Sequence, residues 1–190
     1  MKKNQTRTIE ARFHTRAENG EKRIEGYFAT FKGVYAICAG CVERVDPHAF
    51  DEALDDDIRC LIDHDTRLVL GRTKAGTLDL RVDEEGLWGS VLINEQDQDA
   101  MNLYARVQRG DVSQCSFGFD ILEEDDEWNN ETGEGVFTIK KVKLYEVSCV
   151  TFPAYPDTEI NARKHDVKRH TLEAWKRAQT ARLKGCATKC

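Results

Sequence analysis

Residues 58–93 read IRCLIDHDTRLVLGRTKAGTLDLRVDEEGLWGSVLI, and this stretch decides the fold class. Apolar side chains recur between turn residues, which predicts short strands near 58–64, 68–72, 77–82 and 87–93. Asp83-Glu84-Glu85-Gly86 predicts the turn between the last two strands. Closely spaced strands without intervening helices indicate antiparallel pairing, in a sheet or a closed barrel, rather than a βαβ fold.

The same pattern continues on both sides of this stretch. Segments 9–13 and 24–31 predict two early strands, with Asn19-Gly20 as a turn between them. Beyond it, we expect a strand over 115–122 and a long strand over 136–151, separated by a polar, acidic loop over 123–135.

Two helices are predicted within this mainly β chain. A short one begins after Asp46, which is suited to cap it, with Pro47 at the first helical position. A longer one carries four apolar residues at helical spacing between Asp97 and the stop at Arg109-Gly110: Ala100, Leu103, Tyr104 and Val107. We therefore expect a mainly β fold with helices, of the α+β class.

Charge divides the 190 residues into two predicted parts. Residues 163–190 carry nine Lys and Arg against two Asp and Glu, whereas residues 1–162 carry 19 against 32. We expect a domain over 1–162 and a basic, helical tail over 163–190. The acidic body would repel phosphates, which disfavours nucleic-acid binding.

Composition indicates a soluble protein of the cytoplasm. No stretch approaches the ~20 apolar residues of a membrane-spanning helix, and no apolar segment follows the basic N-terminus. The seven cysteines are expected to be reduced thiols. Cys38-x-x-Cys41 has the spacing of half a zinc site, so a zinc module that also uses His64 is a rival interpretation. We predict no metal and no cofactor.

His64 and Ser116 are individually weak candidates for chemistry. Alternation in a strand would put His64 on one face with Cys60 and Ile62, where a histidine is more often packed than catalytic. Ser116 would share an open face with Gly118, whose missing side chain would leave room for a substrate backbone. A solvent-facing strand serine is the ordinary interpretation of that position.

Glu146 is the third candidate. Alternation would place it on one face with Leu144, Ser148 and Val150, where an unpaired carboxylate is costly. A lysine or arginine partner would make a structural ion pair, and an imidazole partner would suggest catalysis.

Several motifs, taken in chain order, resemble those of the prohead protease family of tailed phages. They cover residues 24–160 and comprise GYFA at 26–29, ERVDPHAF at 43–50, LIDHD and VLGRT at 61–73, GDVSQCSFGF at 110–119 and LYEVSCVTFPA at 144–154. His48 and Gln114 depart from glycines that are common in the family. The resemblance implies a serine protease with Ser116 as nucleophile, His64 as base and Glu146 as the third member.

The family further implies a fold like that of herpesvirus assemblin, an antiparallel β-barrel with surrounding helices. It implies action in the host cytoplasm, inside the assembling prohead, on scaffold protein, on scaffold-like segments of the major capsid protein, and on the protease itself. Assemblins act as dimers, which leaves a homodimer open here. The alternative is a catalytically silent assembly factor that keeps the fold and binds scaffold.

Overall fold

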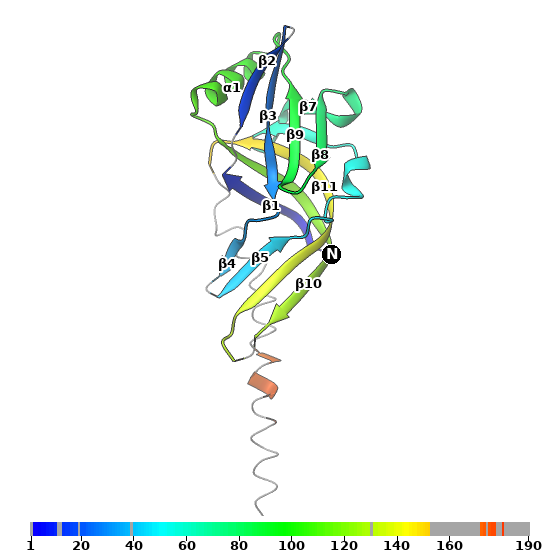
Figure 1. The fold of residues 1–190 in the computed structure, drawn as a ribbon, viewed down its shortest axis with the longest axis vertical. Coiled ribbons are helices and arrows are strands. Elements are labelled where there is room, and N and C mark those ends of the chain that lie inside the picture. The colour runs from blue at the N-terminus through cyan, green and yellow to red at the C-terminus, as the bar shows by residue number, and fades with distance from the viewer. Residues whose placement is uncertain are drawn as a thin grey trace, which may run out of the picture.

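The computed structural model describes residues 2–10, 13–18, 20–38, 40–129 and 131–152, and helical positions at 172, 173, 175–177 and 180. Strands dominate the described chain (Figure 1). In order they are β1 (Lys2–Glu10), β2 (His14–Glu18), β3 (Glu21–Thr30), β4 (Tyr35–Cys38), β5 (Cys41–Val45), β6 (Arg59–Ile62), β7 (Asp65–Arg72), β8 (Leu78–Val82), β9 (Gly86–Leu92), β10 (Gln114–Trp128) and β11 (Gly135–Val150). The helix α1 spans Gln98–Arg109, and 3₁₀ turns span Ala53–Asp55 and Thr73–Ala75.

These strands form two sheets. The larger has the order β1-β10-β11-β5-β4, with β6 added to β11 and β7 added to β6. The smaller has the order β2-β3-β9-β8. The long β10 and β11 run through the larger sheet and extend beyond the body as a two-stranded arm, beside which β4 and β5 lie (Figure 1).

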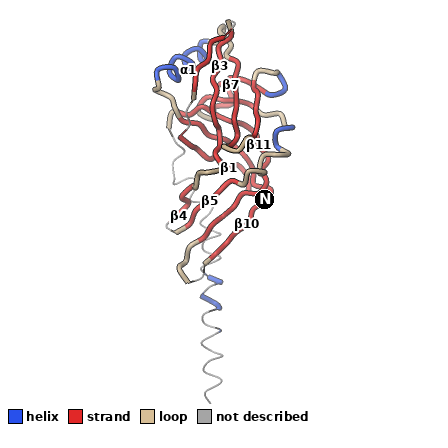
Figure 2. The backbone as a smooth tube through the Cα atoms, viewed as in Figure 1, coloured by secondary structure: helices blue, strands red, loops and turns tan. Residues whose placement is uncertain are grey.

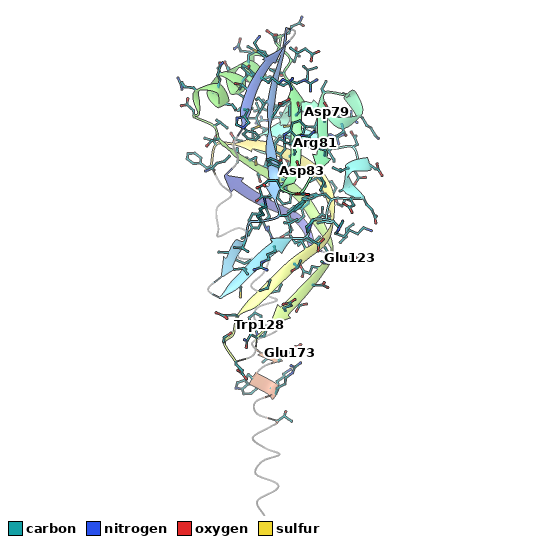
Figure 3. All side chains as sticks on the ribbon, viewed as in Figure 1. Asp79, Arg81, Asp83, Glu123, Trp128 and Glu173 are labelled. Atoms are coloured by element: carbon teal, nitrogen blue, oxygen red, sulfur yellow. The ribbon has the colours of Figure 1, made fainter. Side chains whose placement is uncertain are left out.

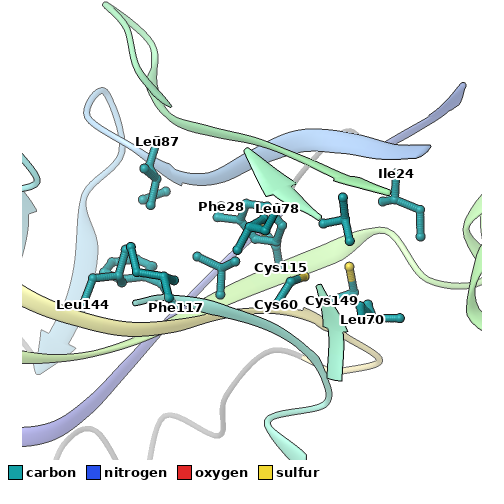
Figure 4. Close-up of a cluster of buried hydrophobic side chains, with 14 of the residues drawn as sticks. Ile24, Phe28, Cys60, Leu70, Leu78, Leu87, Cys115, Phe117, Leu144 and Cys149 are labelled. Atoms are coloured by element: carbon teal, nitrogen blue, oxygen red, sulfur yellow. The ribbon is translucent and has the colours of Figure 1, made fainter. Parts of the chain in front are cut away.

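One apolar core lies between the sheets (Figure 4). The smaller sheet contributes Ile24 and Phe28, and the larger contributes Phe117 and Val147, all four at 0% exposure. Phe117 stacks on Phe119 with ring centroids 4.7 Å apart, which adds to the stabilisation by burial. The side chains of β10 that face the core are therefore Phe117 and Phe119, as strand alternation predicts. Ser116 lies on the opposite face of the strand.

The expected fold class is correct at the level of a mainly β chain with helices, but the closed antiparallel barrel is wrong. The described strands, red in Figure 2, make two sheets with no ladder between them. The larger sheet is also mixed, because β5 and β6 both pair with β11 in parallel. At 16 residues, β11 is long enough to take two short strands in succession, one along each half.

The predicted helix before Gly110 is confirmed, with Asp97 as N-cap and Gly110 in the left-handed region (φ 86°). The short helix after Asp46 is wrong. Asp46 accepts a hydrogen bond from the His48 N–H, but the chain makes successive turns ending in the 3₁₀ turn Ala53–Asp55.

About half of the acidic segment predicted as a loop over 123–135 is strand. Residues 123–128 pair with β11 and form one side of the arm, on which Figure 3 shows Glu123 and Trp128. The tail prediction falls mostly outside the described residues. Its described positions are helical and exposed: Leu172, Glu173, Trp175, Lys176, Arg177 and Thr180. Among the described helices, none is long and apolar enough to cross a membrane.

A buried ion pair braces the larger sheet. The Arg7 guanidinium of β1 lies over the Phe119 ring, 5.6 Å from its centroid, and reaches the Glu43 carboxylate of β5. The pairing is bidentate, with Arg7 Nη2 to Glu43 Oε2 at 2.9 Å, and the two side chains are only 2% and 0% exposed. Because β10 and β11 separate β1 from β5 in the sheet order, this pair links two strands that are not neighbours in the sheet.

We predict that Glu43→Gln destabilises the protein by about 3–5 kcal/mol, since it leaves the Arg7 charge buried without its carboxylate partner. Urea unfolding followed by circular dichroism measures this. Glu85→Gln is the matched control, because Glu85 pairs with the exposed Lys32 and should change the midpoint little. Equal midpoints for Glu43→Gln and the wild type would contradict the structural role of the pair.

Candidate active site

His64 lies in a tight turn rather than in a strand. Strands β6 and β7 form a hairpin whose two-residue loop is Asp63-His64, with φ of 48° and 60°. Positive φ at both loop residues is the type I′ pattern that suits the twist of a hairpin. The prediction that His64 shares a strand face with Cys60 and Ile62 is therefore wrong.

Asp63 stabilises this turn, which is unfavourable for residues other than glycine. Its carboxylate accepts hydrogen bonds from the Thr151 N–H at 2.6 Å and the Thr151 hydroxyl at 2.9 Å, and its own N–H donates to the Cys149 carbonyl. Asp63 thus fixes the hairpin to the end of β11, and its carboxylate is directed at Thr151.

Strands β10 and β11 bring the other two candidates together. In their antiparallel ladder Ser116 lies opposite Ser148, and Gly118 lies opposite Glu146. The next pair is Phe119 with Leu144, so Tyr145 is an extra residue in a bulge. The bulge puts Leu144 in the core, which corrects the prediction that Leu144 shares a face with Glu146.

Gly118 makes space for the Glu146 side chain. A Cβ atom at position 118 would lie 2.2 Å from Glu146 Oε1, closer than real Cβ contacts come. The glycine is therefore required by the carboxylate opposite it. The room beside Ser116 that we expected to admit a substrate backbone is occupied by Glu146.

The Glu146 carboxylate accepts hydrogen bonds at both oxygens. His64 Nδ1 lies 2.8 Å from Oε1, and the Ser148 hydroxyl donates to Oε2 at 2.5 Å. Arg59 lies opposite Glu146 in the ladder with β6, but its side chain bonds to Asp57. Of the two partners foreseen for Glu146, the imidazole is the one present.

This contact raises the pKa of His64 and sets its tautomer. Burial lowers the pKa of the imidazole, but the hydrogen bond and negative charge of Glu146, with a smaller contribution from Asp63, outweigh burial and leave the pKa raised. Because a carboxylate only accepts, Nδ1 carries the proton and Nε2 is the basic nitrogen.

Ser116 is fully buried, which corrects the expectation of an open, solvent-facing position. Its hydroxyl donates to the Arg7 carbonyl of β1 at 3.0 Å. Within the described residues no hydrogen bond joins Ser116 to His64. Contacts between nucleophile and base commonly tighten only when substrate binds.

The zinc interpretation needs Cys41 and His64 to be neighbours, and the strands keep them apart. Cys41 packs with Ile37 and Phe137 and lies opposite Gly135, at the start of β11. His64 contacts Glu146, further along the same strand. At ~3.3 Å per residue this separation is roughly 35 Å, so one ion cannot bind both residues.

Local sequence patterns do not predict two features of the site. The first is that Ser148 donates a hydrogen bond to Glu146. The only signal for it in the sequence is that a serine follows Glu146 two residues further along the same strand. The dependence of Glu146 on Gly118 comes from strand register, which no local pattern shows.

A serine, a histidine and a carboxylate on one part of a sheet are the side chains that serine hydrolases use. Comparison with known proteins places the chain in the class of viral serine proteases. Within that class it belongs to the caudovirus prohead serine protease family, whose model matches residues 7–173. The family resemblance seen in the motifs is thereby confirmed.

Two known proteins show the extent of the similarity. The prohead protease of Escherichia phage T5 is 33% identical over 121 residues, covering 64% of this chain and 52% of that protein. The chain thus spans about half the length of the curated relative it matches. The solved capsid assembly protease of bacteriophage T4 aligns with a TM-score of 0.47 and 12% identity, over 79% of this chain and 100% of that one.

We predict that Gly118→Ala lowers kcat about 100-fold, because the new methyl group displaces the Glu146 carboxylate and, through it, the imidazole. A peptide-cleavage assay measures kcat, and NMR titration should show a lowered His64 pKa. Gly118→Ala combined with Glu146→Asp should recover part of the rate, since the shorter acid leaves room. Wild-type kcat in Gly118→Ala would contradict this packing.

Proposed function

We propose that this chain is a serine endopeptidase in which Ser116 is the nucleophile, His64 the general base and Glu146 the residue that orients His64. The observation that carries the proposal is the 2.8 Å contact between His64 Nδ1 and Glu146 Oε1, next to the strand that bears Ser116. It supplies the base and its orienting group, the two parts a serine hydroxyl needs in order to react near neutral pH.

The proposed roles define the following reaction. His64 Nε2 takes the hydroxyl proton while Ser116 Oγ attacks the peptide carbonyl, and the proton then passes to the leaving amine. Water hydrolyses the acyl-enzyme with His64 again acting as base. Ser116 must first leave the Arg7 carbonyl, a side-chain rotation that exchanges one acceptor for another.

We further propose that the substrates are the scaffold protein, scaffold-like segments of the major capsid protein, and the protease itself. The site of action would be the assembling prohead in the host cytoplasm. The family of the chain and the name of its T5 relative support this assignment. The basic tail over 163–190 would attract an acidic scaffold.

One observation favours a second candidate, a catalytically silent assembly factor. Ser116 is fully buried and its hydroxyl is held by a backbone carbonyl, as in a structural serine. The silent factor and the protease differ in one respect, which is whether Ser116 forms and breaks covalent bonds.

We predict that wild-type protein, incubated with the cognate scaffold and capsid proteins, releases fragments of them and of itself that mass spectrometry detects. Ser116→Ala and His64→Gln should leave all proteins intact, since each removes a group needed for acyl transfer. Ser90→Ala, a buried serine of the other sheet, is the matched control and should cleave like the wild type. Intact proteins in the wild-type reaction would favour the silent factor.

We predict that activity rises with pH through the raised pKa of His64, because only the neutral imidazole acts as base. In Glu146→Gln burial still lowers the pKa of His64, so the rise of kcat/KM at acidic pH, the acidic limb of the pH profile, should move to lower pH. The plateau of kcat/KM above this limb should fall by roughly 10³- to 10⁴-fold. The pH profile of kcat/KM measures both effects. Asp120 is a buried carboxylate of β10 that accepts a hydrogen bond from the Tyr145 hydroxyl at 2.9 Å, and it serves as the matched control. Asp120→Asn should leave the limb in place; a shift in Asp120→Asn instead of Glu146→Gln would move the third role to Asp120.

The raised pKa of His64 also makes the stability of the fold depend on pH. Since the folded-state pKa of His64 is raised, the His64–Glu146 pair stabilises the fold below the unfolded pKa of histidine. This contribution is lost as pH rises through the folded-state pKa.

A further inference from the structure

We propose that Ser148 is a positioning residue, which holds the Glu146 carboxylate in the orientation that His64 requires. This inference rests on the proposed roles of Ser116, His64 and Glu146. The geometry points to it because Ser148 Oγ donates to Glu146 Oε2 at 2.5 Å, while His64 uses the other oxygen.

The Glu146 carboxylate has few other restraints. A glutamate side chain has several rotatable bonds, and one hydrogen bond leaves the carboxylate free to rotate about it. Within the described residues, His64 and Ser148 are its two hydrogen-bond donors. The nearest cation along the ladder, Arg59, is bonded to Asp57.

The contact between Ser148 and Glu146 is short and largely buried. A hydroxyl bonded to a carboxylate at 2.5–2.7 Å is a charge-assisted hydrogen bond, stronger than one between neutral groups. Ser148 is 0% exposed and Glu146 is 14% exposed, so water competes little for either group. A buried hydroxyl needs an acceptor, and the carboxylate supplies it.

Ser148 is close to both Ser116 and Glu146 in the sheet. It lies directly opposite Ser116 in the ladder and two residues beyond Glu146, on the same face of β11. The hydrogen bonds therefore connect Ser148, Glu146 and His64 in one chain next to the proposed nucleophile. A change at Ser148 acts on His64 through Glu146, and the three residues work as one unit.

Peptide cleavage by Ser148→Ala tests the proposal. We expect kcat to fall about tenfold with KM nearly unchanged, since one hydrogen bond to a charged group is lost. The acidic limb of the pH profile should shift to lower pH, because a loosened Glu146 raises the pKa of His64 less. The groups that set this pKa from the elements around it are Glu146 of β11 and Asp63 of the hairpin turn.

Two variants separate positioning from a general loss of packing. Ser148→Thr keeps the hydroxyl and should restore both kcat and the acidic limb. Ser90→Ala removes a buried serine that donates to Glu25 in the other sheet at 2.9 Å, and should change neither. Ser148→Ala with wild-type kcat and an unmoved limb, while Ser116→Ala is inactive, would overturn the role of Ser148 alone.

A labelling experiment keeps the two proposals distinguishable. Treatment with a fluorophosphonate and peptide mapping should place the adduct on Ser116 in the wild type and, more slowly formed, in Ser148→Ala. An adduct on Ser148 would overturn its positioning role and reassign the nucleophile. No adduct on any serine of the wild type would count against the proposed function itself.

Discussion

The Glu146 carboxylate, held over Gly118 by donors to both of its oxygens, is the contact on which the rest of the site depends. A carboxylate on a largely buried strand face is costly unless it is fully partnered. The partners come from separate parts of the chain: His64 from a hairpin turn and Ser148 from β11. The bulge at Tyr145 turns Glu146 away from the core, so the backbone irregularity and the paired carboxylate are parts of one arrangement.

The larger sheet holds these groups in place. Its core side is packed with aromatic rings and braced by the buried Arg7–Glu43 pair, which leaves β10 and β11 little freedom to shift. The same β1 residue presents its carbonyl to the Ser116 hydroxyl. In the proposed mechanism His64 is therefore oriented in the absence of substrate, whereas Ser116 would have to rotate about χ1 away from the Arg7 carbonyl before it could donate to His64. Ordering of the base beforehand reduces the entropy lost in reaching the transition state.

Local pattern predicted much of this fold and less of its assembly. Alternation in Phe117 and Phe119 correctly put Ser116 on the face away from the core, and the caps Asp97 and Gly110 placed α1. Strand alternation failed at His64, because a type I′ turn interrupts it. Contacts that depend on register, such as Glu146 with Gly118 or Arg7 with Glu43, join residues far apart in sequence. The motif resemblance grouped Ser116, His64 and Glu146, which no local periodicity could do.

The central claim is that Ser116, His64 and Glu146 form one catalytic unit when substrate binds. A crystal structure of the protein trapped with a peptidyl phosphonate tests it most directly. The account predicts a covalent bond from Ser116 Oγ to phosphorus, His64 Nε2 within about 2.6–3.2 Å of that oxygen, and Glu146 still bonded to His64 Nδ1. An adduct on another residue, or a bound phosphonate with the His64 ring turned away from Ser116, would contradict it.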